Sequence, residues 1–187
     1  MVPLADLWLP ILLSAVFVFA VSSVVHMVLP LHRGDYGRLP QEDRVLEAMR
    51  ASGVVRGDYR FPHAASMKDM GSKEMAEKWR KGPVGTMTIL PDGMPAIGRS
   101  LVQWFAFSLV VGVVTAYAAR LSLARGADFV QVLRITAAVS FLAYGLSHAQ
   151  DSIWKGVRWT TSLKYVFDGI LYGIATGLSF GWFWPAA

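Results

Sequence analysis

Four polar side chains that could bind a metal or carry protons lie within otherwise apolar stretches of this sequence: His26, Gln103, His148 and Asp168. Imidazole nitrogens and a carboxylate oxygen are ligands for zinc and iron, and two imidazoles can also be the axial ligands of haem b. Histidine titrates near neutral pH, so the same groups could relay protons. The sequence leaves these three uses open beside a structural one, in which Asp168 pairs with Lys164 one turn earlier and the histidines hydrogen-bond near a membrane surface.

A second set of candidate ligands consists of His63, Met67 and Met70, which one helical turn or a tight loop would bring together. Thioether and imidazole ligands suit Cu(I). Methionine is also a common gap-filler in irregular packing, and we favour that interpretation for this segment. No cofactor is therefore predicted outright, and haem b or a metal ion is the alternative.

The elements that must position these residues follow from composition. The sequence is 54% hydrophobic and only 17% charged, against roughly 25% charge in a typical soluble domain. A bilayer core needs about 20 apolar residues of helix. Four segments approach that length, namely residues 7–29, 100–119, 129–148 and 163–184. We therefore predict a single all-α membrane domain over residues 1–187, a bundle of four transmembrane helices with an extramembrane loop at 30–98.

The loop between the first two segments is predicted to be partly helical. Residues 40–51 have proline and acidic residues at their start and a glycine after their end, which is typical of a short helix. Residues 72–81 start with a serine cap and end before Gly82-Pro83, so they predict a second helix. Residues 85–90 have strand character and precede a turn at 91–93.

Chain direction predicts that the four polar residues share one depth. The first and third helices end on the side of the long loop, and the second and fourth begin there.

Basic residues near helix ends concentrate on the side of the long loop, including Arg33, Arg99, Lys155 and Arg158. The positive-inside rule then places the loop in the cytoplasm and both termini outside a bacterial inner membrane.

Polar stripes and a glycine stripe mark the predicted inner faces of the third and fourth helices. Residues four apart share a helix face, and polar faces in membranes point away from lipid. The polar positions that accompany His148 and Asp168 are Thr136, Ser140, Tyr144, Tyr172 and Thr176. Glycines at the same spacing allow a close approach of another helix, from the same chain or from a second copy. They are Gly169, Gly173, Gly177 and Gly181.

Several function classes are excluded or disfavoured. The loop mixes acidic and basic residues, unlike a nucleic-acid-binding face, and the absence of cysteine excludes disulfides and thiolate-bound metals. No phosphate-binding loop, H-E-x-x-H or G-x-S-x-G motif occurs. The leading interpretation is a non-enzymatic accessory or scaffold subunit in the lipid bilayer, in a homo-oligomer or with other membrane subunits. The alternatives are ion, proton or small-solute permeation along His26, His148 and Asp168, and haem or metal binding.

The last predicted helix contains Phe167-Asp168-Gly169 and closes on Phe180-Gly181-Trp182-Phe183-Trp184-Pro185, and the loop contains Lys81-Gly82-Pro83-Val84-Gly85. In these runs the chain resembles a group of small, functionally uncharacterised bacterial four-helix integral membrane proteins. The resemblance extends over most of the chain. It implies the four-helix arrangement and indicates no substrate or site.

Overall fold

The computed structural model describes residues 1–187, and their contacts divide the chain into two compact units. The first, the helical unit, comprises Met1–Asp35, Ala96–Ser152 and Val157–Ala187. The second, the hairpin unit, comprises Tyr36–Pro95 and Ile153–Gly156. The sequence predicted one membrane domain with a loop at 30–98, and most of that loop forms the compact hairpin unit.

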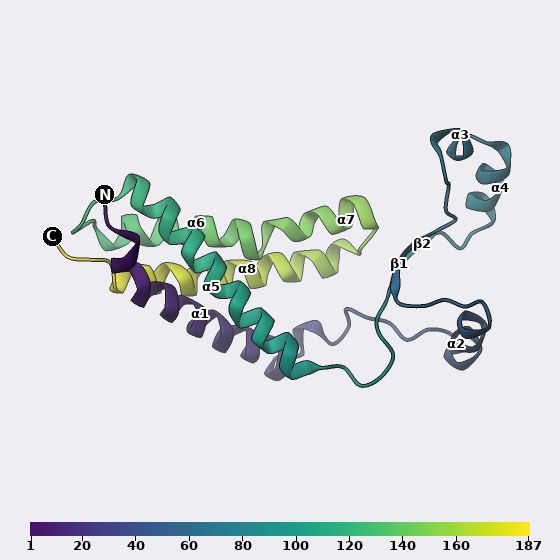
Figure 1. Cartoon of the computed structure of the whole chain (residues 1–187), viewed down its shortest axis with the longest axis horizontal. Coiled ribbons are helices and arrows are strands. Elements are labelled where there is room, and N and C mark those ends of the chain that lie inside the picture. The colour runs from purple at the N-terminus through teal and green to yellow at the C-terminus, as the bar shows by residue number, and fades with distance from the viewer. The chain divides into compact units, whose positions relative to one another are not determined.

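The helical unit consists of long helices with short irregular turns at their ends (Figure 1). In chain order they are a 3₁₀ turn Leu4–Leu7, α1 (Trp8–Ser23), a π-helical turn Val24–Val28, a 3₁₀ turn Pro30–His32, α5 (Ile97–Ser122), α6 (Phe129–Tyr144), a 3₁₀ turn Leu146–His148, α7 (Ala149–Lys155) and α8 (Trp159–Trp182). The residues of α7 from Ile153 onward belong to the hairpin unit.

Three of these helical stretches are long and apolar enough to cross a membrane: Leu4–Val28, Ile97–Ser122 and Phe129–Lys155. They correspond to the first three predicted segments, with each stretch starting or ending a few residues away from the predicted limits. The fourth predicted segment is α8, whose 24 residues give a length of about 36 Å. It is not among the three.

Helix α8 packs along α6 and α1, while α5 packs on α1 and α6 and crosses the other helices obliquely (Figure 1). The glycine stripe of α8 lies against the α6 side. A Cβ at Gly169 would lie 2.3 Å from the Cα of Gly145, and one at Gly173 would lie 3.0 Å from the carbonyl oxygen of Ala137. The absence of side chains at these positions is what lets the two backbones approach.

The interior of the helical unit is unusually polar. The side chains of Thr136, Ser140, Tyr144, Tyr172 and Thr176 are all buried. The hydroxyls of Thr136 and Ser140 donate to carbonyl oxygens one turn back, at 2.7 Å each, which satisfies them without any partner on another helix. The apolar core is split into two clusters, one around Phe180 and Leu7 and one around Tyr144 and Tyr172.

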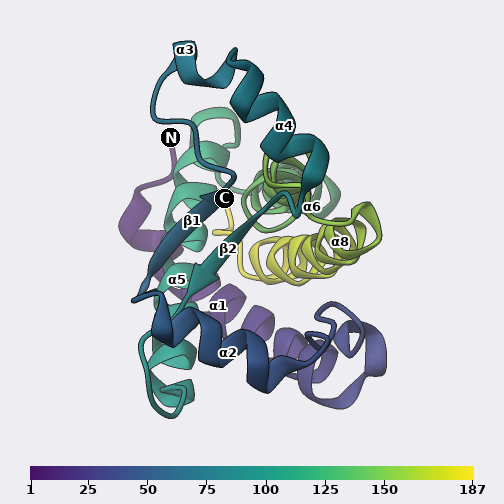
Figure 2. The ribbon, with the colours of Figure 1, turned by 90° about the vertical axis from the view of Figure 1, so that its right-hand side faces the viewer.

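The hairpin unit is built on a two-stranded antiparallel sheet, in which β1 (Gly57–Phe61) pairs with β2 (Gly85–Ile89) (Figure 2). Its helices are α2 (Glu42–Ala51), α3 (Met67–Met70) and α4 (Lys73–Lys81). Helices α2 and α4 lie within the segments predicted as 40–51 and 72–81. The hydroxyl of Ser72 accepts a hydrogen bond from the amide of Met75, which is the expected N-cap.

The glycine contact between α6 and α8 gives a stability prediction. We expect Gly169→Ala to lower the free energy of unfolding by about 2 kcal/mol or more, because the new methyl group would meet backbone atoms that cannot rotate away. Gly98→Ala is the control, since Gly98 is also helical but has nothing within 4 Å of a Cβ. Thermal unfolding in detergent, followed by circular dichroism, compares the two. Equal melting temperatures would contradict the close α6–α8 contact.

Candidate metal centre

The structure brings two of the predicted site residues, His26 and Asp168, together with His32, which the sequence analysis did not single out. Nε2 of His26 lies 3.5 Å from Oδ2 of Asp168, and Nε2 of His32 lies 2.9 Å from the same oxygen. One potential ligand atom from each residue lies within 4.8 Å of the other two. The imidazole rings of His26 and His32 stack with centroids 4.3 Å apart.

Local backbone geometry explains how two histidines six residues apart meet. After α1 the chain widens into a π-helical turn, closed by a hydrogen bond of 3.0 Å from the amide of Leu29 to the carbonyl of Val24. Leu29 is extended, as expected for a residue before proline, and Pro30 then starts a 3₁₀ turn. This reversal returns His32 to the ring of His26 above the first turns of α8.

Asp35 contacts the ring nitrogen of His32 that does not face Asp168. Its Oδ2 lies 2.6 Å from Nδ1 of His32, and its Oδ1 accepts a hydrogen bond of 2.6 Å from Nζ of Lys164. Only 1% of the Asp35 side chain is exposed. Burial acts to raise the pKa of Asp35, but the hydrogen bonds from Lys164 and His32 outweigh it, and the net effect lowers the pKa. Asp35 is therefore a carboxylate, and Nδ1 of His32 is the nitrogen that carries a proton to it.

This tautomer leaves an unusual contact on the other side of the ring. With Nδ1 protonated, Nε2 of a neutral His32 carries a lone pair. It faces the buried Oδ2 of Asp168 at 2.9 Å, yet neither that nitrogen nor either Asp168 oxygen has a hydrogen-bond partner. Two acceptors at this distance repel one another unless a cation lies between them. The geometry therefore suits a bound cation, which can be a metal ion or a proton.

Gln103 and His148, the other residues of the predicted polar layer, lie outside the cluster of His26, His32 and Asp168, called the trio below. His148 stacks on Tyr165 with ring centroids 4.9 Å apart, and its Nδ1 is 3.8 Å from Asp151. Gln103 is exposed on α5. The structural alternative of a pair between Lys164 and Asp168 is not formed, because Lys164 bonds to Asp35 instead. His26 stacks on His32, and haem binding through His26 and His148 stays a prediction.

The second candidate set lies in the hairpin unit. His63 precedes α3, and Met67 and Met70 are the first and last residues of that helix. All three side chains are exposed, and 80% of the surface of Met67 is accessible. His63 has no buried nitrogen that lacks a hydrogen-bond partner, in contrast to His32.

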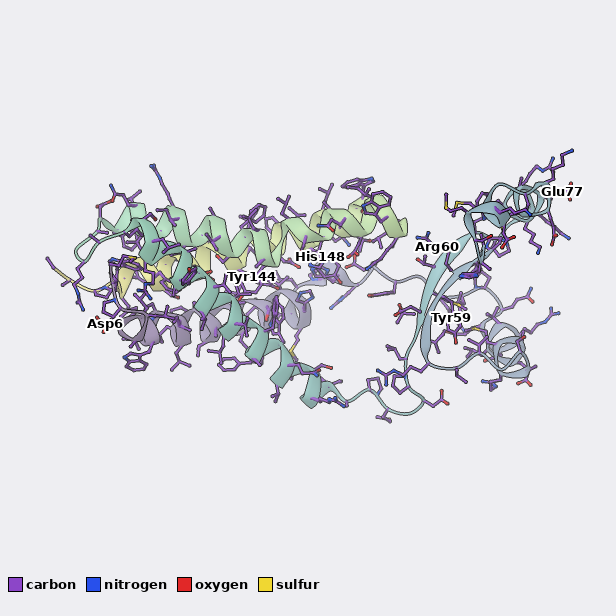
Figure 3. All side chains as sticks on the ribbon, turned by 45° about the horizontal axis from the view of Figure 1, so that its top comes forward. Asp6, Tyr59, Arg60, Glu77, Tyr144 and His148 are labelled. Atoms are coloured by element: carbon purple, nitrogen blue, oxygen red, sulfur yellow. The ribbon has the colours of Figure 1, made fainter.

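A cavity of about 530 Å³ opens directly beside the trio, within the helical unit. His26, Asp168 and His148 line one part of it, and aromatic side chains from α5, α6 and α8 line much of the rest. These aromatic residues are Trp104, Phe107, Tyr144, Tyr165 and Tyr172. Figure 3 labels two of the lining residues, Tyr144 and His148. A volume of this size is within the range of about 300–1,000 Å³ that is usual for small-molecule sites.

His32 escaped the sequence analysis because it lies beyond Pro30, in the segment assigned to the extramembrane loop. The available signal was local: a second histidine and Asp35 shortly after the apolar segment that contains His26. Such a signal cannot show that the chain reverses. The sequence also does not indicate that Lys164 pairs with Asp35 and not with Asp168. That pairing depends on how the turn after Pro30 lies against α8.

The comparisons leave the function to be inferred from this geometry. No protein-family model matches the chain, and no curated protein or solved structure is significantly similar to it. The resemblance noted in the sequence therefore stays an expectation, and the residues of the site carry the functional argument.

The hydrogen bonds of Asp35 to His32 and Lys164 give a second stability prediction. We expect Asp35→Asn to lower the free energy of unfolding by about 2 kcal/mol, because it removes one partner of a pair in which Asp35 is buried and Lys164 is partly exposed. Asp6→Asn is the control, since Asp6 and Arg125 form a more exposed pair in the same unit, of a kind that contributes about 0.2–1 kcal/mol. Thermal unfolding in detergent measures both, and an equal effect would contradict the role of Asp35.

Proposed function

We propose that this chain is a multi-pass membrane protein that binds one divalent transition-metal ion, Zn²⁺ or Fe²⁺, through His26, His32 and Asp168. The observation that carries the proposal is the contact of 2.9 Å between Nε2 of His32 and Oδ2 of Asp168, two buried acceptors without a hydrogen-bond partner. An ion between the three side chains would satisfy all of them at once.

The donor set supports this class of metal. Two imidazoles and one carboxylate occur in zinc sites with three protein ligands and one open position, and in non-haem Fe(II) sites. With neutral imidazoles, one carboxylate and a divalent ion, the centre carries a net positive charge of one. Asp35 supports it further, because a carboxylate on the other nitrogen of a metal-bound histidine fixes the tautomer and the orientation of the ring.

A proton is the alternative occupant, and it would fit the permeation role considered from the sequence. The specific observation in its favour is a row of rings that continues from the trio. The ring centroid of Tyr165 lies 5.0 Å from that of His32, with the rings tilted, and 4.9 Å from that of His148, with the rings stacked. The scaffold role is less supported, because the glycine stripe that motivated it lies against residues of α6 and its neighbouring turn within the same chain.

We further propose that α8 also crosses the membrane, which completes a four-helix bundle. Its start is joined to α7 by a hydrogen bond of 2.7 Å between the hydroxyls of Ser152 and Ser162. Just beyond its other end, the carbonyl of Pro185 accepts a hydrogen bond of 2.9 Å from the amide of Gly126, before the start of α6. Helix α8 thus covers the same length as α6 and α7. Basic flanking residues support a cytoplasmic hairpin unit in a bacterial inner membrane.

Elemental analysis of detergent-purified, untagged protein tests the metal site. We expect about one zinc or iron ion per chain in the parent protein, and less than a tenth of that in His26→Ala and in His32→Ala. His148→Ala is the matched control, because the side chains of His26 and His148 are equally exposed, at 38%. It should retain the metal.

The same preparations decide between the occupants of the site. A folded parent protein that stays metal-free after incubation with Zn²⁺ or Fe²⁺ would exclude the metal and leave the proton. Equal metal loss in His26→Ala and His148→Ala would contradict the assignment of ligands. Circular dichroism identifies any variant that has lost metal only because it has unfolded.

Single cysteines test the arrangement in the membrane, since the chain has no cysteine of its own. We expect Ala187→Cys to react with a membrane-impermeant maleimide in intact spheroplasts, and Ser52→Cys to react only after lysis. Labelling of both residues in intact spheroplasts, or of neither until lysis, would mean that the two sites lie on one side of the membrane, and would contradict the fourth crossing. The reverse pattern would keep four crossings and overturn the proposed sidedness.

A further inference from the structure

The cavity beside the trio has features of a ligand site that the metal alone does not explain. His26 and Asp168 line it, so a metal ion held by them would face its interior. Two imidazoles and one carboxylate leave at least one coordination position for another molecule. This inference rests on the proposed metal site and concerns what would occupy that open position.

A buried hydroxyl points to the chemistry of the occupant. Tyr172 lines the cavity and is only 3% exposed, and its hydroxyl has no hydrogen-bond partner. By contrast, the hydroxyl of Ser22 is satisfied, because it accepts a hydrogen bond from the indole of Trp104 and donates one to the carbonyl of Phe19. A buried phenol hydroxyl without a partner is energetically costly, and a ligand oxygen could accept its hydrogen bond. The head group therefore needs one oxygen for the metal and one for Tyr172.

The charge of the centre selects among such head groups. A divalent ion with two neutral imidazoles and one carboxylate has an uncompensated positive charge in apolar surroundings, where charge pairing matters most. A carboxylate head group would neutralise that charge, and it offers two oxygens for two partners. A cationic head group would be repelled, and a hydrocarbon alone would leave the hydroxyl of Tyr172 without a partner.

The mouth of the cavity indicates where the occupant comes from. Met27, Leu101 and Phe107 line the cavity and are among the exposed apolar side chains, with Met27 78% exposed. They belong to two stretches of the chain, one near the end of Leu4–Val28 and one within Ile97–Ser122, both of which are apolar enough to span a membrane. A molecule that reaches the cavity past these side chains would move through a lipid-like environment and needs an apolar tail.

We infer that the cavity binds a single-tailed carboxylate amphiphile, with its carboxylate on the metal ion and the hydroxyl of Tyr172 and its hydrocarbon tail among Trp104, Phe107 and Tyr144. The cavity volume of about 530 Å³ is suited to one small ligand of this kind. Medium-chain fatty acids are the simplest members of the class.

Fluorescence quenching of Trp104 tests this inference in the full chain. The zinc-loaded protein in detergent is titrated with 12-bromododecanoate, whose bromine quenches nearby indoles. We expect saturable quenching that unbrominated dodecanoate reverses and that Trp104→Phe abolishes. Dodecyltrimethylammonium has the same tail length without an oxygen donor and should not compete. Tyr172→Phe should weaken binding about tenfold, the usual effect of losing a hydrogen bond to a charged group.

A matched pair of variants separates the cavity from the metal centre. Ala143→Phe adds bulk to a cavity-lining position on α6, and we expect it to retain zinc but to lose saturable quenching. Ala138→Phe is the control, because Ala138 is exposed on the same helix outside the cavity lining, and it should behave like the parent protein.

The outcomes distinguish this inference from the proposed function. Zinc binding without saturable quenching would overturn the amphiphile and leave the metal site standing. Saturable quenching that is equally strong after a chelator has removed the zinc would overturn the role of the metal in holding the head group. A parent protein that binds no metal would overturn both.

Discussion

The burial of the Asp168 carboxylate is the constraint on which the rest of the helical unit depends. The side chain is 2% exposed within the helical unit, and an uncompensated buried charge is very costly. Its neighbours are two imidazoles, and no arginine or lysine pairs with it. A carboxyl group in this position is tolerated if it is protonated, or if those imidazoles bring positive charge to it as imidazolium or by sharing a metal ion. The irregular backbone around it makes that arrangement possible.

That irregular backbone is concentrated where α1 ends. In a regular helix His32 would lie about 9 Å further along the axis than His26, so the two imidazoles would not meet at Asp168. The π-helical turn, the extended Leu29 and the 3₁₀ turn at Pro30 reverse the chain within a few residues. Asp35 then secures the reversed segment through Lys164, while Arg158 donates to the carbonyls of Gly34 and Asp35. Two carboxylates thus flank the ring of His32, one partnered by lysine and one available for a cation.

The packing of α8 contributes both to the contact with α6 and to the lining of the cavity. Glycines on one side bring it against the α6 side, and Asp168 and Tyr172 bring polar groups to the cavity on the other. Close packing on one face gives the helix a fixed orientation, which a site with ligand atoms within 4.8 Å of one another requires. Helix α5 crosses the other helices obliquely (Figure 1). Its Trp104 and Phe107 form part of the aromatic lining of the cavity. The proposed metal site and the cavity are thus parts of one arrangement.

The sequence by itself determined the elements with strong local signals. The apolar stretches, the two short helices that became α2 and α4, and the strand at residues 85–89 were all predictable, because length, capping and turn residues act over a few positions. It also identified His26 and Asp168, since polar groups in apolar stretches stand out. Only the tertiary structure decided the partner strand β1, the choice of His32 over His148, and the pairing of Lys164 with Asp35. Each of these depends on where a chain reversal places residues that are distant in sequence, and periodicity carries no information about that placement.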